Sequence, residues 1–144
     1  MGQVSAQEAI ALLDRLIATP SHSREESGTG DVIEAFLRAK GVDVQRIYNN
    51  VWARCVAFDS NKPTLLLNSH HDTVKPSAAY TVDPYTPLHR DGRIYGLGSN
   101  DAGASVVALA ATFCQYYREE LPFNLILALT AEEEVMGEKG MRAM

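Results

Sequence analysis

The sequence has 144 residues, of which 46% are hydrophobic, and a formal net charge of −5, which suits one globular domain with its own core. The mild acidity and the scattered Lys and Arg residues argue against nucleic acid as a partner. No apolar run approaches the length of a membrane span, and no basic stretch followed by an apolar one marks a signal peptide. Cys55 and Cys114 stand far apart in apolar surroundings, as reduced core thiols do. We therefore expect a cytoplasmic protein without a nucleic-acid or membrane partner.

The first forty residues predict two amphipathic helices. A capping box at Ser5–Glu8 precedes apolar residues at helical spacing, which predicts a helix over 6–18. A second capping box at Ser23–Glu26 precedes another apolar face, and Gly41 suits the C-terminal end of that helix.

The period of the pattern then changes to that of strands. Val42–Tyr48 and Val51–Phe58 predict a hairpin around a turn at Asn49–Asn50. The continuous apolar run in Thr64–Asn68 is typical of a strand buried on both faces.

The second half of the chain alternates irregular and regular segments. Three prolines predict an irregular Lys75–Pro87, and Asp91–Gly92 predicts a tight turn. A helix over Gly103–Tyr117, a buried strand over Asn124–Leu129 and the start of a helix in Gly137–Met144 follow. Strands interleaved with helices indicate an α/β fold with a mixed, largely parallel central sheet flanked by helices.

Polar residues follow three of these elements. The clusters are His70, His71 and Asp72; Asp101; and 132–134, which are three glutamates. In open α/β sheets ligands bind beyond the carboxyl ends of the strands, so parallel neighbours would bring these clusters together. So many carboxylates repel one another unless a divalent cation lies among them. Imidazole mixed with carboxylate suits zinc best, with cobalt or manganese less favoured.

Each cluster also has a plainer explanation. A histidine at a strand end is more often structural than a ligand, three consecutive glutamates are usually a solvated face, and Asp101 before a helix is usually an N-cap. Their shared position at the ends of predicted strands favours the metal site. His71 alternates away from His70 and receives no ligand role, although an exchange of the two is left open. Tyr80 is predicted to pack rather than to contact a substrate.

Three ordered motifs carry a family resemblance. Residues 67–74 resemble the His-x-Asp-[Thr/Val]-Val signature of M20 peptidases and deacylases, residues 91–101 resemble their Asp-Gly-x-x-x-Gly-Arg-Gly-x-x-Asp segment, and residues 130–134 resemble their Thr-x-Asp-Glu-Glu. Within that family the sequence is most similar to acetylornithine deacetylases and succinyl-diaminopimelate desuccinylases. Leu97 stands where many members have Arg, and Gly103 where many have Lys.

The resemblance implies a role for each polar residue. His70 would ligate one metal, Asp101 would bridge two, and Glu134 would ligate a metal, with two zinc ions, or cobalt, in a complete site. Asp72 would orient His70 and raise its basicity. Glu133 would be the general base that takes a proton from the attacking water and passes it to the leaving amine. A cis peptide bond would join Asp101 to Ala102.

The resemblance also bears on domains and function. It implies that 1–144 is the N-terminal portion of a zinc-dependent exopeptidase-like catalytic domain, without the family's lid domain and C-terminal catalytic segment. The expected activity is removal of an acyl group from an N-acyl amino acid such as N-acetylornithine, in arginine biosynthesis, by a homo-oligomer. A dipeptidase or aminopeptidase of the same family is one alternative, and a catalytically inactive fragment that serves as a folding or assembly module is another.

Overall fold

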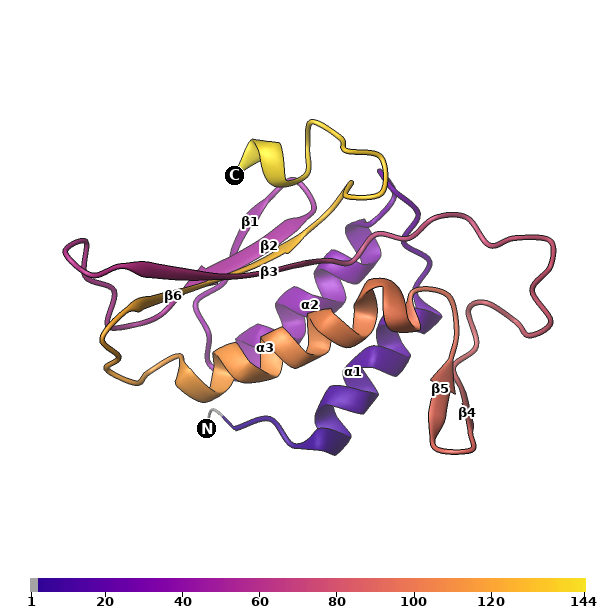
Figure 1. Ribbon diagram of the computed structural model, residues 1–144, viewed down its shortest axis with the longest axis horizontal. Helices are drawn as coiled ribbons and strands as arrows, with labels where there is room; N and C mark the ends of the chain where they lie inside the picture. Colours follow the sequence, from indigo (N-terminus) through magenta and orange to yellow (C-terminus); the bar gives the residue numbers. More distant parts are fainter. Residues whose placement is uncertain (1–2) are drawn as a thin grey trace.

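The computed structural model describes residues 3–144. Its main body is a four-stranded sheet with three helices on one face (Figure 1). The helices are α1 (Ala6–Ala18), α2 (Ser27–Ala39) and α3 (Ala104–Tyr116). The sheet has the order β1 (Gln45–Ile47), β2 (Asn50–Arg54), β6 (Asn124–Thr130), β3 (Thr64–His70). Across residues 3–144, no helix combines the length and the apolar character needed to cross a membrane.

The two N-terminal helices differ in how they begin. In α1 the predicted capping box is confirmed, because Ser5 Oγ accepts from the Glu8 N–H and the Glu8 carboxylate accepts from the Ser5 N–H. The second predicted capping box is wrong. Helix α2 begins at Ser27, and its N-cap residue Glu26 makes no side-chain capping bond. Gly41 ends this helix as predicted, with φ of 78°, a conformation that costs glycine little.

The sheet is mixed, as predicted. Strands β3 and β6 are parallel, while β2 pairs antiparallel with both β1 and β6. Strand β6 is the central, buried strand. The prediction that Thr64–Asn68 is buried on both faces is wrong, because β3 has a strand neighbour on one side only within residues 3–144 and leaves Leu65 48% and Leu66 43% exposed. The predicted hairpin forms, but its strands β1 and β2 are shorter than the predicted segments Val42–Tyr48 and Val51–Phe58.

The core lies between the sheet and the helices. Side chains from all three helices and from the two inner strands meet there. Those with 0% exposure are Ile33, Leu37, Val51, Ala53, Val106, Ala110, Phe113, Leu127 and Leu129. Burial of this apolar surface is the main force that holds the helices on the sheet.

The connection from β3 to α3 runs beyond the end of the sheet. Residues 75–87 contain no helix or strand, as predicted, and β4 (Leu88–Arg90) and β5 (Arg93–Tyr95) form a small hairpin around the predicted turn. A short kinked segment, η1 (Ser99–Gly103), in which Asp101 and Ala102 have non-helical backbone angles, leads into α3. The helix predicted in Gly137–Met144 is reduced to one 3-10 turn, η2 (Met141–Ala143).

Candidate metal centre

The candidate centre lies where β3 and β6 end. His70, the last residue of β3, pairs with Thr130, the last residue of β6. Parallel pairing in this register brings the Glu132–Glu134 segment to the same edge of the sheet as His70. Asp101 arrives from η1, after a turn in which Gly98 has φ of 75° and leaves no room for a Cβ beside Thr73.

Four side chains from three segments meet at this edge. Single ligand atoms of His70, Glu133 and Glu134 all lie within 4.8 Å of one another. His70 Nε2 is 3.1 Å from Asp101 Oδ1 and 3.7 Å from Glu133 Oε2. One imidazole and two carboxylates at separations that a single ion can bridge, with a third carboxylate beside the imidazole, are a donor set that fits a divalent transition metal.

Asp72 contacts the ring nitrogen of His70 that points away from the other carboxylates. His70 Nδ1 lies 3.1 Å from the Asp72 backbone carbonyl oxygen and 3.3 Å from its Oδ1. A carbonyl oxygen only accepts, so Nδ1 carries a proton and Nε2 is the nitrogen that faces the carboxylates. Asp72 is fully buried and also accepts from Ser23 Oγ, at 2.8 Å, and from the backbone N–H groups of Glu133 and Glu134, at 3.0 and 3.1 Å.

The charges of these groups shift their pKa values. The hydrogen bond with Asp72 raises the pKa of His70 to about 9, against a smaller opposing effect of burial. Burial would raise the pKa of Asp72, but its bonds from His70, Ser23 and the two backbone N–H groups outweigh that effect and lower the pKa to about 2. Burial and the neighbouring Asp101 charge raise the pKa of Glu134. Like-charge repulsion of this kind favours cation binding.

His71 faces the other way. It is only 5% exposed, its Nε2 donates to the Asn49 carbonyl oxygen at 2.9 Å, and its Nδ1 lies 2.8 Å from Thr29 Oγ1. Burial lowers the pKa of His71 to about 4. It is therefore a neutral, structural histidine whose ring nitrogens are both occupied.

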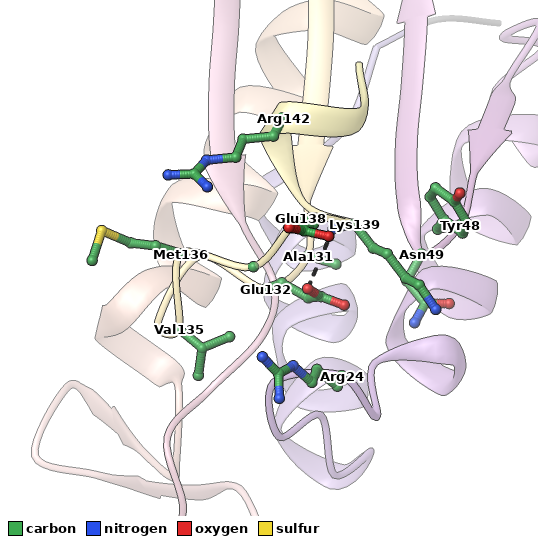
Figure 2. A pocket seen from close by; sticks show the side chains of 11 residues that line it. Arg24, Tyr48, Asn49, Ala131, Glu132, Val135, Met136, Glu138, Lys139 and Arg142 are labelled. Carbon is green, nitrogen blue, oxygen red and sulfur yellow. Dashed lines mark hydrogen bonds between the residues drawn. The ribbon is translucent and has the colours of Figure 1, made fainter.

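Two cavities flank the Glu132–Glu134 segment. One, of about 260 Å³, is lined by Asp101 and Glu134 and opens beside the cluster. Tyr80, predicted as a packing residue, is instead 42% exposed and lines this cavity. The other, of about 670 Å³, is lined by Glu132, whose carboxylate accepts from the Lys139 backbone N–H rather than joining the cluster (Figure 2).

The sequence did not reveal three residues that hold the site. Ser23 and Glu26, predicted as a helix cap, instead bind Asp72 and the Glu132 backbone N–H. Asn50, predicted as a turn residue, accepts from the Ala131 N–H. No local signal pointed to these roles, because Ser23–Glu26 has the spacing of a capping box.

The predicted site residues nevertheless lie together. His70, Asp72, Asp101, Glu133 and Glu134 gather at one edge of the sheet. The bond between Asp101 and Ala102 is cis, as the resemblance implied.

Comparison with known proteins adds to this geometry. Residues 66–144 match the peptidase family M20/M25/M40. The chain is 29% identical over 137 residues to a succinyl-diaminopimelate desuccinylase of Delftia acidovorans, a match that covers 87% of this chain and 36% of that protein. It is 34% identical over 148 residues to a probable carboxypeptidase of Emericella nidulans, covering 97% of this chain and 34% of that one.

Solved structures show the same fold. A dinuclear metal binding peptidase from the M20 family, the YXEP protein of Bacillus subtilis, superposes with a TM-score of 0.69 at 19% identity, over 95% of this chain and 38% of that one. The chain thus spans about a third of the length of the curated relatives. Because the family match covers more than half of the 144 residues, and the fold agrees with it, this protein belongs to peptidase family M20/M25/M40.

Proposed function

We propose that the protein is a metal-dependent amidohydrolase that removes the acyl group of an N-acyl amino acid. The observation that carries this proposal is the meeting of His70, Asp101, Glu133 and Glu134 at the end of the parallel strand pair. Membership of a peptidase family supports hydrolysis of an amide bond.

The donor set supports a specific division of roles. We assign His70, Asp101 and Glu134 as the residues that would hold two zinc ions, with Asp101 as the shared ligand, because Asp101 Oδ1 lies 3.1 Å from His70 Nε2 and a Glu134 oxygen lies within 4.8 Å of a His70 ring nitrogen. The likeness to the Bacillus subtilis protein, a dinuclear metal binding peptidase, supports two metals rather than one. Cobalt is the next candidate.

The chain's own residues would divide the chemistry as follows. The metal, when bound, supplies a Lewis acid that polarises the scissile carbonyl and acidifies water. The Glu133 side chain is 59% exposed and its carboxylate lies 3.7 Å from His70 Nε2, so it is the carboxylate that would move the proton from the attacking water to the leaving nitrogen. Asp72 holds the Nδ1–H of His70 and so keeps Nε2 directed at the site.

The substrate class is proposed from the relatives. The desuccinylase named above acts, by its name, on succinyl-diaminopimelate, which supports an acyl amino acid. We retain N-acetylornithine, and with it a place in arginine biosynthesis, as the specific substrate to be tested against the succinylated one. The probable carboxypeptidase favours the alternative of a peptide substrate. Assays of both N-acyl amino acids beside a dipeptide panel would separate these possibilities.

Two properties of the whole protein are part of the proposal. We propose a cytoplasmic location, which two free, buried cysteines suit. We also propose a homo-oligomer, and sedimentation equilibrium would test it.

The first experiment measures zinc by elemental analysis after dialysis. We expect the parent chain to retain zinc and Glu134→Ala to lose most of it. Glu138→Ala is the matched control, because it removes the same charge four residues away at an exposed position. Equal zinc in all three proteins would refute the ligand assignment. Zinc in none of them would favour the alternative of a folding or assembly module without catalysis.

A further inference from the structure

The segment that contains Glu133 and Glu134 is held by hydrogen bonds from four successive backbone N–H groups, those of residues 131–134. The Ala131 N–H donates to Asn50 Oδ1 at 2.9 Å, and the Glu132 N–H donates to Glu26 Oε1 at 3.2 Å. The next two N–H groups donate to the two carboxylate oxygens of Asp72. No strand or helix partner takes these four groups; side chains take all of them.

The acceptors come from three separate parts of the fold. Glu26 precedes α2, Asn50 opens β2 and Asp72 follows β3. All three residues are fully buried, with 0% exposure. Burying a carboxylate is costly unless every oxygen is satisfied, so such groups persist where they fix a particular geometry.

Glu26 is the acceptor whose position needs an explanation. Besides the Glu132 N–H, its carboxylate accepts from the Arg24 N–H and from Asn49 Nδ2. It forms no ion pair within residues 3–144 and makes no capping bond to its own helix. Its side chain therefore serves neither charge pairing nor the start of α2.

Glu132, whose N–H donates to Glu26, has an unusual backbone conformation. Glu132 has φ of 54°, in the left-handed region that few residues other than glycine adopt. It is also the last residue before Glu133, so its backbone angles set the direction in which Glu133 and Glu134 leave the sheet. A ligand held about 1 Å out of place loses much of its effect.

We propose that Glu26 is a positioning residue that fixes the Glu132 backbone and thereby aims Glu133 and Glu134 at His70. This inference rests on the proposed function, because it treats those two glutamates as a general base and a metal ligand. It predicts that the site depends on the acceptor at Glu26 Oε1, and not on the volume, charge or helix-capping capacity of residue 26.

Two variants separate these properties. Glu26→Asp keeps the charge and a side chain that can cap a helix, but its carboxylate is withdrawn by one C–C bond, about 1.5 Å, from the Glu132 N–H. Glu26→Gln keeps an oxygen for the Glu132 N–H. Asn49 can turn its amide to accept from the new NH2, at the loss of the long 3.4 Å bond that its Oδ1 accepts from Arg46. Glu25→Asp is the control at an exposed neighbouring position.

The probe is Co²⁺, added to each metal-free protein after circular dichroism and thermal melting have shown that it is folded. Visible absorption reports ligand geometry, and titration gives the dissociation constant. We expect Glu26→Asp to weaken Co²⁺ binding about 10–100-fold and to shift the absorption bands, as loss of a supporting bond does. Glu26→Gln and Glu25→Asp should stay within about threefold of the parent, well below the 10–100-fold change.

Amide hydrogen exchange in the metal-free protein gives a second readout. Exchange at Glu132–Glu134 should be faster in Glu26→Asp than in the parent. Parent-like Co²⁺ binding and bands in folded Glu26→Asp would overturn the positioning role and leave the proposed function intact. If the parent itself bound no Co²⁺, or if His70→Ala bound it equally well, the proposed function would fail and this inference with it.

Discussion

Asp72 gives the sharpest test of how the site is supported. Its two carboxylate oxygens accept from Ser23, Glu133, Glu134 and His70. Asparagine at this position has the same shape but replaces one oxygen with an NH2 group. We consider Asp72→Asn in the metal-free protein first, so that metal binding does not contribute to stability.

The loss of stability in Asp72→Asn depends on which hydrogen bond the new amide breaks. With its oxygen at the Oδ1 position, the amide still accepts from the Glu133 N–H and from His70 Nδ1–H. Its NH2 then faces the Glu134 N–H, which is left without an acceptor, while the Ser23 hydroxyl can turn to accept. One unsatisfied buried donor costs about 1–3 kcal/mol. For 144 residues the entropy of unfolding is about 0.3 kcal/mol/K, so Tm should fall by about 3–10 °C.

The same variant should bind metal less tightly. Without the carboxylate, the orientation of His70 is fixed by a weaker, neutral hydrogen bond, so Co²⁺ affinity should fall about 10–100-fold. Differential scanning calorimetry in EDTA and Co²⁺ titration measure the two effects. Asp43→Asn, at an exposed position, is the control and should change neither. An unchanged Tm together with unchanged Co²⁺ affinity in Asp72→Asn would refute the argument that Asp72 supports the site.

Three further expectations test other parts of the molecule. Glu133→Gln should keep the parent's zinc content but lower amide hydrolysis about 10²–10⁴-fold in the assay that detects the parent's activity, because it removes the proton carrier and not a ligand; equal loss of zinc would make Glu133 a ligand instead. Burial raises the pKa of the Cys114 thiol to about 11, so at pH 8 Ellman's reagent should modify Cys114 only after denaturation, and rapid reaction of the folded protein would show that the helix opens. Leu127→Ala on the central strand should lower the free energy of unfolding by about 2–5 kcal/mol, whereas Leu66→Ala, 43% exposed on β3, should change it by less than about 1 kcal/mol in urea titrations.

The polar residues at strand ends were the part of the site that chain order could predict. His70 and Glu134 each follow an apolar strand, and only the assumption of parallel neighbours was needed to bring them together. Asp101 follows a separate hairpin and reaches the site from η1. Strands β3 and β6 do run parallel, with their ends level. This prediction came from short, continuous apolar runs, which are local and visible in one sequence.

The supporting residues could not be predicted in the same way. Ser23–Glu26 satisfies the spacing of a capping box, and nothing local indicates that its side chains bind Asp72 and Glu132 instead. Tertiary contacts overrode the local preference there. The exposure of Leu65 was missed for a related reason, because an apolar run does not reveal how many neighbouring strands cover it.

The pairing of β3 with β6 has a consequence for the fidelity of folding. Because side chains alternate along a strand, a slip of β3 by one residue would bring His71 to the position and the face of His70. Leucines fill 65–67, so the places of Leu65 and Leu66 would still hold leucine, but Asn68 would take the place of Leu67, which packs against the core. Hydrogen bonds also distinguish the two registers: Asn68 Nδ2 donates to the Ala128 carbonyl oxygen at 2.9 Å, and Thr130 Oγ1 donates to that of Ser69 at 3.2 Å.

The hydrogen bonds of His71 also favour the correct register of β3 over the slipped one. In the correct register both of its ring nitrogens find partners in the buried layer beneath the sheet edge. A slipped strand would leave those partners unsatisfied and put a different imidazole at the centre. Either of the two adjacent histidines could therefore occupy the metal centre. The hydrogen bonds at the end of β3 favour the register in which His70 does so.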